Sequence, residues 1–488
     1  MQLPPNGPGD PPGRPTIRGV GGIACRAVRG IGALVAAALV VLGPAVVPAG
    51  AAPALPVDAP VPPPPDARAL AALDPEPHPL PGVQSRVPCV RPARGGVIPG
   101  APWGQQRLRF TDAWRFTRGA GQTVAVIDTG VSPHPRLAGR LVDGGDFVGR
   151  AGGLLDCDGH GTLVAGIIAA APDPATGFVG VAPDARVLSI RQSSLTVSTT
   201  SPDGTAGTGG GNVDTLAEAI VRATRLGATV INVSEAACVP AAGAGPALAP
   251  LRAAVRAAVD ADVVVVAAAG NAGSGACTQG ADGQGAGQVV APAWFGDDVL
   301  SVGYTRRDGL PSPLSLRGPW VSLSAPGSEI VSLDPAGPGV VDTVAPIGAD
   351  RSVPIEGTSF AAPYVSGVVA LVRARYPGLD ARQVMARVTA SADRPGGAPA
   401  SGGAHDDAVG AGTVDPVAAV ADVRPDEFTG DGPVSVSPAG AGRVDLSDGR
   451  DAHSGSRTVA LAGSAAAMAL LGGTGLIVLV ARRARRSR

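Results

Sequence analysis

The feature that most constrains the fold is a regular alternation of strand-like and helix-like segments. Four short apolar runs have the length of buried strands, at residues 123–128, 186–190, 229–233 and 263–268. Three segments between them have the composition of helices, at residues 161–170, 213–226 and 250–259. Strands that alternate with helices predict βαβ units, and therefore an α/β fold with a mostly parallel sheet. Because the strands are apolar throughout, we expect helices on both faces of the sheet.

The chain after residue 268 continues this pattern with shorter segments. We expect short strands near 298–303 and 320–324, followed by helices over 359–376 and 380–392. Residues 196–212 are rich in Ser, Thr and Gly and are predicted to form a loop. In an open parallel sheet, functional side chains gather on loops at the carboxyl ends of the strands, so candidate residues are expected there.

Both ends of the chain carry patterns typical of membrane targeting. Residues 1–51 combine a basic start, an apolar stretch and a small-residue cleavage site at 49–51, which predicts a secretory signal peptide; an uncleaved signal anchor is the alternative. Residues 458–481 carry no charge and precede an arginine-rich tail at 482–488. This predicts one transmembrane helix with a cytoplasmic C-terminus. The residues in between are therefore expected on the extracytoplasmic side of the cell membrane.

Proline and glycine divide the chain between these ends. Residues 52–102 hold 15 of the 49 prolines and are predicted to form a mostly irregular extension. Residues 423–457 are rich in Gly, Pro and Ser and are predicted to be a flexible linker to the membrane helix. The segment 103–422 has the small apolar side chains of a packed core and is the predicted globular domain.

Charge and cysteine usage exclude several classes of function. The net charge of −1 leaves no basic surplus for nucleic acid. The chain contains no lysine, which excludes Schiff-base and P-loop chemistry. An extracytoplasmic site permits two disulfides, in any of three pairings, among Cys89, Cys157, Cys238 and Cys277. The spacing of these cysteines does not match a zinc site, and we expect no metal or cofactor.

Histidine usage points to one candidate base. Of five histidines, only His160 stands at the head of an apolar helix, between two glycines, although a capping or turn histidine is an equal alternative on this segment alone. Asp128 ends the first predicted strand and could orient His160 by accepting its Nδ1 proton. Asp128 also begins an Asp-Thr-Gly triplet, as in aspartic proteases. That chemistry needs a second carboxylate, but the triplet has no second copy and the βαβ pattern opposes an all-β fold.

Two further residues are weak candidates when each is taken alone. Ser359 opens an apolar helix, whose N-terminus favours developing negative charge, but a capping serine is the more common interpretation. Asn271 follows the strand at 263–268 in a glycine-rich turn. Its amide could stabilise an oxyanion, although asparagine in such a turn usually serves only the turn.

Together, these residues resemble a known catalytic constellation. Asp128, His160 and Ser359 follow the chain order of the subtilisin triad, and the chain resembles the subtilase family of serine proteases from about residue 103 to 422. The matching segments are 124–131, 160–162, 269–271 and 357–363. The resemblance implies a subtilisin-like catalytic domain in which Ser359 is the nucleophile, His160 the general base and acid, and Asp128 the orienting carboxylate. It also implies an oxyanion hole made by Asn271 and the Ser359 N–H.

The whole layout is similar to the mycosins, membrane-anchored subtilases of actinobacterial type VII secretion systems. The signal peptide, the proline-rich extension, residues 156–160 and the C-terminal helix with its arginine tail carry this resemblance. It implies the disulfides Cys89–Cys157 and Cys238–Cys277. It also implies an extracytoplasmic serine endopeptidase that processes substrates or components of a type VII secretion membrane complex. A structural subunit with secondary protease activity and a generic cell-surface protease are the alternatives.

Two stretches depart from the common subtilase pattern. Most subtilases have Ser-Leu-Gly where this chain has Ser234, Glu235 and Ala236, in a segment that lines the substrate cleft of the family. Ser234 and Glu235 are therefore expected to contact substrate, and the glutamate argues against a broad apolar specificity. The extension has too many prolines to fold as a compact inhibitory pro-domain. We expect it to wrap the domain and leave the active site open.

Overall fold

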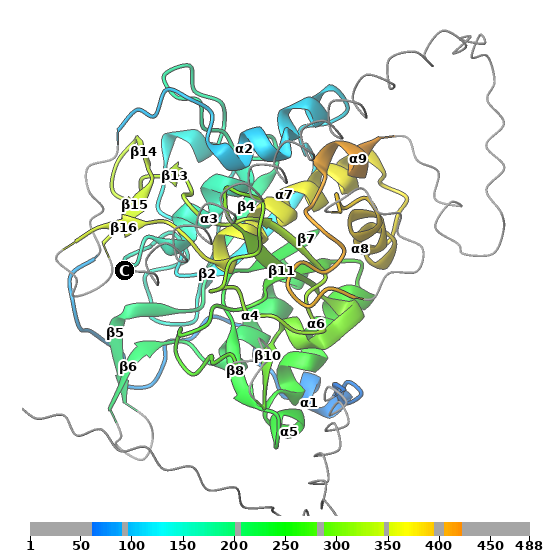
Figure 1. The fold of residues 1–488 in the computed structure, drawn as a ribbon. Coiled ribbons are helices and arrows are strands. Elements are labelled where there is room, and N and C mark those ends of the chain that lie inside the picture. The colour runs from blue at the N-terminus through cyan, green and yellow to red at the C-terminus, as the bar shows by residue number, and fades with distance from the viewer. Residues whose placement is uncertain are drawn as a thin grey trace, which may run out of the picture. The chain divides into compact units, whose positions relative to one another are not determined.

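The computed structural model of the chain describes residues 61–89, 96–200, 206–280, 287–345, 351–394 and 405–421 (Figure 1). The predicted signal peptide, the first residues of the extension, the whole predicted linker at 423–457, the predicted membrane helix and the arginine-rich tail lie outside these residues. Within the described ranges, no helix is both long enough and apolar enough to cross a lipid bilayer.

A seven-stranded sheet forms the centre of the domain (Figure 1). Its strands are β2 (Thr123–Asp128), β3 (Leu141–Asp146), β4 (Arg186–Arg191), β7 (Val230–Val233), β9 (Val264–Ala268), β11 (Leu300–Thr305) and β12 (Leu323–Pro326). They lie in the order β12-β11-β9-β7-β2-β4-β3, and every neighbouring pair is parallel. The predicted α/β fold with a mostly parallel sheet is confirmed.

Helices cover both faces of this sheet. The helices of the domain are α2 (Trp103–Leu108), α3 (His160–Ala169), α4 (Val213–Arg225), α5 (Ala244–Ala247), α6 (Ala249–Asp260), α7 (Thr358–Arg375), α8 (Ala381–Ala390) and α9 (Pro416–Val420). α3 packs against α7, α4 packs against α6, and both pairs contact strands of the sheet. Every residue of β7, β9 and β11 is buried, although successive side chains of a strand point to opposite faces. Neither face of the central strands is therefore open to solvent.

The predicted loop at residues 196–212 is wrong. In its place β5 (Ser194–Thr200) and β6 (Ala206–Gly210) pair as antiparallel strands, and β1 (Gln84–Ser85) adds to the outer edge of β5. Thr and Val have high strand propensity, and here they outweigh the Ser and Gly content that suggests a loop. The extension therefore meets the domain through a small three-stranded sheet.

The remaining elements are short and connect the larger ones. Three are 3-10 helices: η1 (Phe110–Arg115), η2 (Pro135–Leu137) and η3 (Ala293–Asp298). Antiparallel pairs form between β8 (Ala237–Pro240) and β10 (Gln288–Ala291), β13 (Ser332–Leu333) and β14 (Val340–Val341), and β15 (Thr343–Val344) and β16 (Val353–Pro354). Segments this short show no hydrophobic periodicity, so the sequence pattern predicts none of these pairs.

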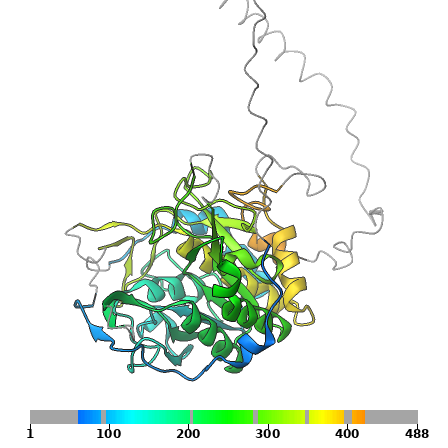
Figure 2. The ribbon, with the colours of Figure 1, turned by 90° about the horizontal axis from the view of Figure 1, so that it is seen from below.

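The described part of the extension runs along the surface of the domain (Figure 2). It contains β1 and one short helix, α1 (Ala67–Ala71). Leu80 packs with Val148 and Val197, and the Gly96 N–H donates to the carbonyl oxygen of Val340 at 2.9 Å. This path agrees with the expectation that the extension wraps the domain.

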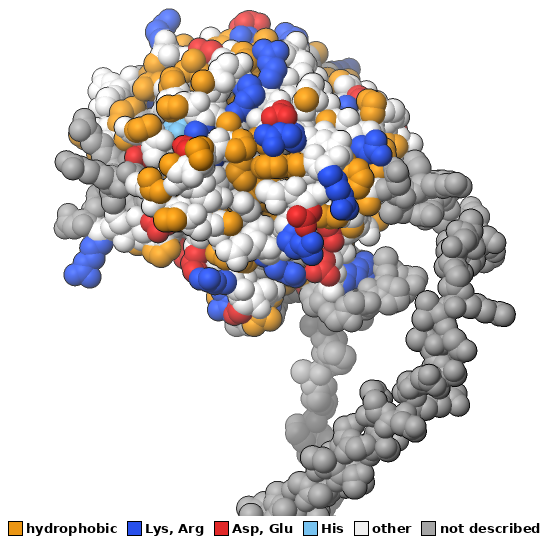
Figure 3. Space-filling view, turned by 90° about the horizontal axis from the view of Figure 1, so that it is seen from above, with side chains coloured by type: hydrophobic (Ala, Val, Ile, Leu, Met, Phe, Trp, Pro, Cys, Tyr) orange, Lys and Arg blue, Asp and Glu red, His pale blue; other side chains and the backbone are white. Residues whose placement is uncertain are grey.

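Charged side chains are dispersed over the surface. On the face shown in Figure 3, arginine side chains are spread apart, and several lie beside acidic ones. Arg256 pairs with Asp260 at 2.9 Å, and Arg107 pairs with Asp393 at 3.0 Å. In both pairs the acidic side chain offsets the positive charge of its arginine.

Candidate active site

Asp128 ends the strand β2 in the middle of the sheet. β2 lies between β4 and β7, where the strand order reverses, and a crevice opens at such a point in parallel sheets. Asp128 is fully buried. Its Oδ1 accepts hydrogen bonds from the Thr129 N–H at 2.8 Å and from Nδ1 of His160 at 2.7 Å. The second bond assigns the proton of the neutral imidazole to Nδ1, which leaves Nε2 as the basic nitrogen.

A buried carboxylate holds the loop that carries His160. Oδ1 of Asp156 accepts hydrogen bonds from Oγ1 of Thr129 at 2.8 Å and from the Gly159 N–H at 2.7 Å. Its Oδ2 accepts two more from Thr162, from N–H at 2.8 Å and from Oγ1 at 2.6 Å. Burial raises the pKa of Asp156 to about 6, although the hydrogen bonds from Thr162 and Thr129 oppose the rise. Asp156 thus joins the end of β2 to the start of α3.

The first turn of α3 approaches β2 so closely that it requires glycine. A Cβ at Gly161 would lie 2.0 Å from the carbonyl oxygen of Gly130. The Gly161 N–H donates to Oγ1 of Thr129 at 2.9 Å. A larger residue at position 161 would push α3 away from β2 and lengthen the contact between His160 and Asp128.

The charges around His160 favour its protonated form. Burial by itself lowers the pKa of His160, but the charge and hydrogen bond of Asp128 outweigh it, and the carboxylates of Glu235 and Asp156 add to the rise. The net effect raises the pKa of His160 above its ordinary value. The Phe360 ring packs beside the imidazole, with the two ring centroids 5.1 Å apart.

Ser359 lies in the first turn of α7, and a chain of hydrogen bonds ties that helix to β7. α7 begins directly after Gly357, whose φ of 143° is readily adopted only by glycine. Oγ of Ser234 donates to the carbonyl oxygen of Ser359 at 2.7 Å and accepts from Nδ2 of Asn232 at 2.8 Å. Oγ of Ser366 donates to Oδ1 of Asn232 at 2.8 Å. The helix and its first turn are therefore fixed against the sheet.

The side-chain amide of Asn271 is held beside Ser359. Its Oδ1 accepts hydrogen bonds from the Thr358 N–H at 2.9 Å and from Oγ1 of Thr358 at 3.1 Å. A Cβ built at Gly357 would lie 3.2 Å from Nδ2 of Asn271 and also 3.2 Å from Oγ of Ser359. The amide N–H groups and the serine hydroxyl therefore border the same small space, where an oxyanion could be stabilised.

The predicted site residues come together in one cleft of about 570 Å³. Its lining includes His160, Ser234, Glu235, Asn271 and Ser359, and Asp128 is hydrogen-bonded behind His160. The described part of the extension contributes no residue to this lining. In the part of the chain that the structure describes, no group of three or more His, Cys, Asp or Glu is arranged to hold a metal ion.

Glu235 places a carboxylate in the wall of the cleft. Its side chain is half-buried, and Oε1 accepts a hydrogen bond from Oγ of Ser193. Burial and the negative charge of Asp128 raise the pKa of Glu235 to about 7; Asp158 adds to the rise, and Ser193 and His160 oppose it. The cleft is therefore polar and acidic at this point.

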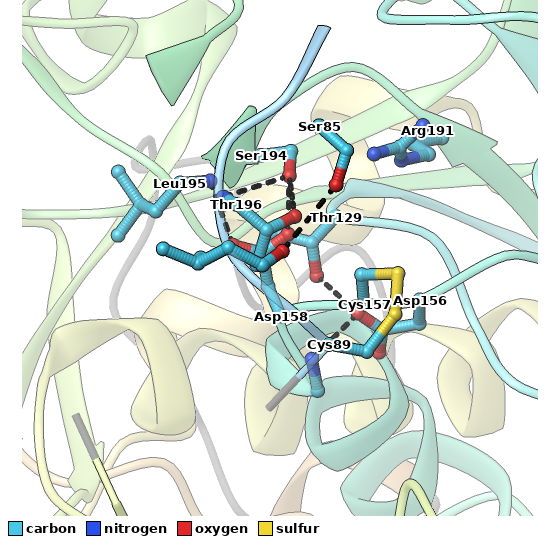
Figure 4. The surroundings of a disulfide bond; sticks show 12 residues. Ser85, Cys89, Thr129, Asp156, Cys157, Asp158, Arg191, Ser194, Leu195 and Thr196 are labelled. Carbon is cyan, nitrogen blue, oxygen red and sulfur yellow. Dashed lines mark hydrogen bonds between the residues drawn. A yellow bond between two sulfur atoms is a disulfide. The ribbon is translucent and has the colours of Figure 1, made fainter. Parts of the chain in front are cut away.

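Two disulfides connect segments that carry residues of the site. Cys89–Cys157 joins the extension to the loop that carries His160, and Cys238–Cys277 joins the segment after Glu235 to the segment after Asn271. Figure 4 shows the first disulfide beside the side chains of Asp156 and Asp158. These are the two pairs that the resemblance to mycosins implies.

Asp156 and Asp158 shape the site, but the sequence did not single them out as functional. Oδ2 of Asp158 accepts a hydrogen bond from Oγ of Ser194, and Oδ1 accepts one from the Leu195 N–H, both at 2.6 Å. Their spacing from His160 could have identified them in the sequence, because carboxylates four and two residues before a candidate base bring negative charge close to it. Their hydrogen-bond partners are far away in sequence and could not be identified from it.

Comparison with known proteins gives consistent matches over this region. A sequence profile described as the subtilase family matches residues 119–412. Mycosin-4 of Mycobacterium tuberculosis is 49% identical over 367 residues, which cover 74% of this chain and 78% of the relative. The MycP3 protease from the type VII (ESX-3) secretion system has a TM-score of 0.63 and 41% identity, over 74% of this chain and 98% of that chain. A chain in the structure of an intact ESX-5 inner membrane complex has a TM-score of 0.65 and 37% identity, over 85% and 98%.

Proposed function

Because the chain belongs to the mycosins, within the subtilase family of serine endopeptidases, we propose that it hydrolyses peptide bonds through Asp128, His160 and Ser359. The observation that carries the proposal is the 2.7 Å hydrogen bond between Asp128 and His160, in a cleft that Ser359 and Asn271 also line. The absence of lysine from the chain supports histidine as the base.

In the proposed reaction, Nε2 of His160 accepts the proton of the Ser359 hydroxyl as Oγ attacks the scissile carbonyl carbon. The buried carboxylate of Asp128 orients the imidazole and stabilises the imidazolium that forms. His160 then donates the proton to the leaving amine, which releases the C-terminal part of the substrate. Water, activated by the same nitrogen, hydrolyses the acyl-enzyme on Ser359.

We propose that the oxyanion of the tetrahedral intermediate lies in the space between Asn271 and Ser359. There Nδ2 of Asn271 and the backbone N–H of Ser359 donate hydrogen bonds to the oxyanion. The hydrogen bonds from Thr358 to Oδ1 support this role, because they hold the amide before substrate arrives. A donor held in this way contributes about 3–4 kcal/mol to transition-state stabilisation.

We propose that the catalytic domain, residues 103–422, works outside the cell membrane. The pattern at residues 1–51 supports export, and the uncharged segment 458–481 with the basic tail 482–488 supports a single membrane pass with a cytoplasmic C-terminus. The extension 52–102 then precedes the domain, and the linker 423–457 joins it to the membrane helix.

We propose that the substrates are proteins exported by, or belonging to, a type VII secretion system. The likeness to the MycP3 protease of such a system supports this. The likeness to a chain within an intact ESX-5 inner membrane complex favours a second role, in which the protein stabilises a secretion complex and proteolysis is secondary. Both roles are compatible with the same fold.

Labelling with a fluorophosphonate probe tests the catalytic assignment. The wild type and the control Ser391→Ala are expected to take up the probe, and Ser359→Ala is not, because the probe reacts with an activated serine. Absence of label on the wild type would refute the proposal.

Secretion in a Ser359→Ala strain, compared with a deletion strain, then separates the two roles, because a structural subunit would still support secretion.

A further inference from the structure

Two carboxylates face the cleft with no arginine or lysine beside them in its lining. Glu235 follows the end of β7, and Asp158 lies two residues before His160; both belong to the cleft lining. No arginine lines the described cleft, and the chain contains no lysine. Histidine is therefore the only residue in this lining that can carry positive charge, and His160 already pairs with Asp128.

Neutral donors hold these two carboxylates in place. Oγ of Ser193 donates to Oε1 of Glu235, while Oγ of Ser194 and the Leu195 N–H donate to the two oxygens of Asp158. Among the described residues, no donor reaches Oε2 of Glu235. The glutamate is thus fixed in orientation and keeps one oxygen available to a ligand in the cleft.

The electrostatic consequence is a site that favours a positive guest. Burial, Asp128 and Asp158 all disfavour the charged form of Glu235 and raise its pKa, and His160 opposes them only when it is protonated. A cation bound at Oε2 would relieve this repulsion. Arginine suits the position best, because its planar guanidinium offers several donors and keeps its charge when partly buried.

We propose that Glu235, assisted by Asp158, selects substrates that carry an arginine or lysine side chain within a few residues of the scissile bond. This inference rests on the proposed peptidase function and names the substrate class of the same cleft. The substrate cation binds Oε2 of Glu235, and Asp158 adds attraction from the neighbouring wall.

A positioning role for Glu235 predicts a different result. If the carboxylate acted only by supporting His160, its loss would slow cleavage of every peptide by the same factor. If it binds a substrate cation, its loss slows only the cleavage of peptides that carry that cation. The ratio of kcat/KM for a basic peptide to that for a matched neutral peptide therefore separates the two roles.

The test uses the purified full-length protein and pairs of fluorogenic peptides. Each pair differs only in arginine against citrulline, its neutral isostere, at one position from four before to two after the cleaved bond. At one position, the wild type is expected to prefer arginine by about 10- to 100-fold in kcat/KM, as for a hydrogen bond to a charged group. Equal cleavage of both peptides at every position would overturn the proposal, and this comparison needs no variant.

The variants assign any preference to a residue. In Glu235→Gln, which keeps the size and the bond to Ser193, the ratio should fall to within about threefold of one, and in Asp158→Asn it should fall partly. The control Glu329→Gln removes the same charge from an exposed position outside the cleft and should keep the wild-type ratio. A ratio that survives in the Glu235→Gln Asp158→Asn double variant would overturn the proposal.

Fluorophosphonate labelling distinguishes this failure from failure of the peptidase function. A wild type that takes up the probe and cleaves peptides without preference refutes only the proposed specificity. A wild type that takes up no probe and cleaves nothing refutes the peptidase function, and the specificity with it.

Discussion

The central sheet and the N-terminal extension are held in different ways, and the candidate site belongs to the first. Every residue of β7 and β9 is buried, whereas α1 buries no residue and β1 is exposed. The extension is held by hydrogen bonds, ion pairs at Glu76 and His78, the small apolar contact of Leu80 and the Cys89–Cys157 disulfide. The difference indicates that packing of the sheet sets the catalytic geometry. The described part of the extension meets the site at its edge, at the loop that carries His160 and at β5, where Arg86 donates to the carbonyl oxygen of the cleft-lining residue Leu195 at 2.9 Å.

The largest expected effect is in the sheet, at Asp128. Asp128→Asn keeps the shape of the side chain but removes its negative charge. Without a carboxylate to accept the hydrogen bond from Nδ1, His160 loses its orientation. We expect kcat to fall about 10⁴-fold with little change in the melting temperature. Peptide cleavage and thermal unfolding measure the two quantities. The surface variant Asp184→Asn is the matched control, and more than a tenth of wild-type activity in Asp128→Asn would contradict the proposed triad.

The next effect is at Asn271, which follows β9. Asn271→Ala removes the amide proposed to stabilise the oxyanion, so kcat should fall about 10²- to 10³-fold while KM stays nearly constant. Steady-state kinetics on a single peptide measure both constants. A rise in KM at unchanged kcat would instead assign Asn271 to ground-state binding.

The sheet is also the region whose structure could be predicted from sequence. The apolar runs that end in Asp128 and Val233 match β2 and β7 closely, because a strand buried on both faces has an unbroken apolar pattern. The β5–β6 pair has no such pattern, because its residues are mostly Ser, Thr and Gly. Its pairing with the extension also depends on a segment that is distant in the sequence. The path of the extension depends on contacts such as Leu80 with Val148, which have no signature in either segment alone.

The site could be predicted in part for a related reason. His160 and Ser359 stand at helix starts and Asp128 at a strand end, so local patterns identify them and the parallel sheet brings them together. Asp156 functions through bonds to Thr129 and Thr162, and such a network becomes visible only when the chain is folded.

The extension is expected to contribute mainly stability. In the double variant Cys89→Ser Cys157→Ser, the free energy of unfolding should fall by about 2–4 kcal/mol, because the disulfide closes a long loop across 68 residues. kcat/KM should stay within a few fold of wild type, since the hydrogen bonds of Asp156 hold the His160 loop independently. Urea denaturation and peptide cleavage test the two parts of this prediction.

The second disulfide provides the contrast within the same protein. Cys277 lines the cleft, and Cys238 follows Glu235 by three residues. Cys238→Ser Cys277→Ser should therefore lower both stability and kcat/KM. If loss of the Cys89–Cys157 disulfide impaired catalysis as strongly as loss of the Cys238–Cys277 disulfide, the extension would help to set the catalytic geometry. The contrast between the two regions would then fail.

A smaller effect is expected in the pH dependence of catalysis. The negative charge of Glu235 helps to raise the pKa of His160, so Glu235→Gln should lower that pKa. Activity requires unprotonated His160 and is lost as the pH falls through its pKa, so the acid limb of kcat/KM should move to lower pH. Rate profiles with a neutral peptide isolate this effect from substrate binding. A shift to higher pH would contradict the charge environment of the site.

The smallest effect is expected at the ion pair between the extension and α4. Glu76 bonds Arg222 at 2.9 Å, but its side chain is 71% exposed, and exposed pairs contribute at most about 1 kcal/mol. Arg222 also donates to the carbonyl oxygens of Gly144 and Pro75, so it stays in place without the carboxylate. Glu76→Gln should therefore lower the free energy of unfolding by less than about 1 kcal/mol, with kcat/KM unchanged, as measured by urea denaturation and peptide cleavage beside Glu329→Gln. A loss of unfolding free energy as large as that caused by removing the Cys89–Cys157 disulfide would mean that a cooperative network holds the extension. The contrast between the extension and the central sheet would then fail.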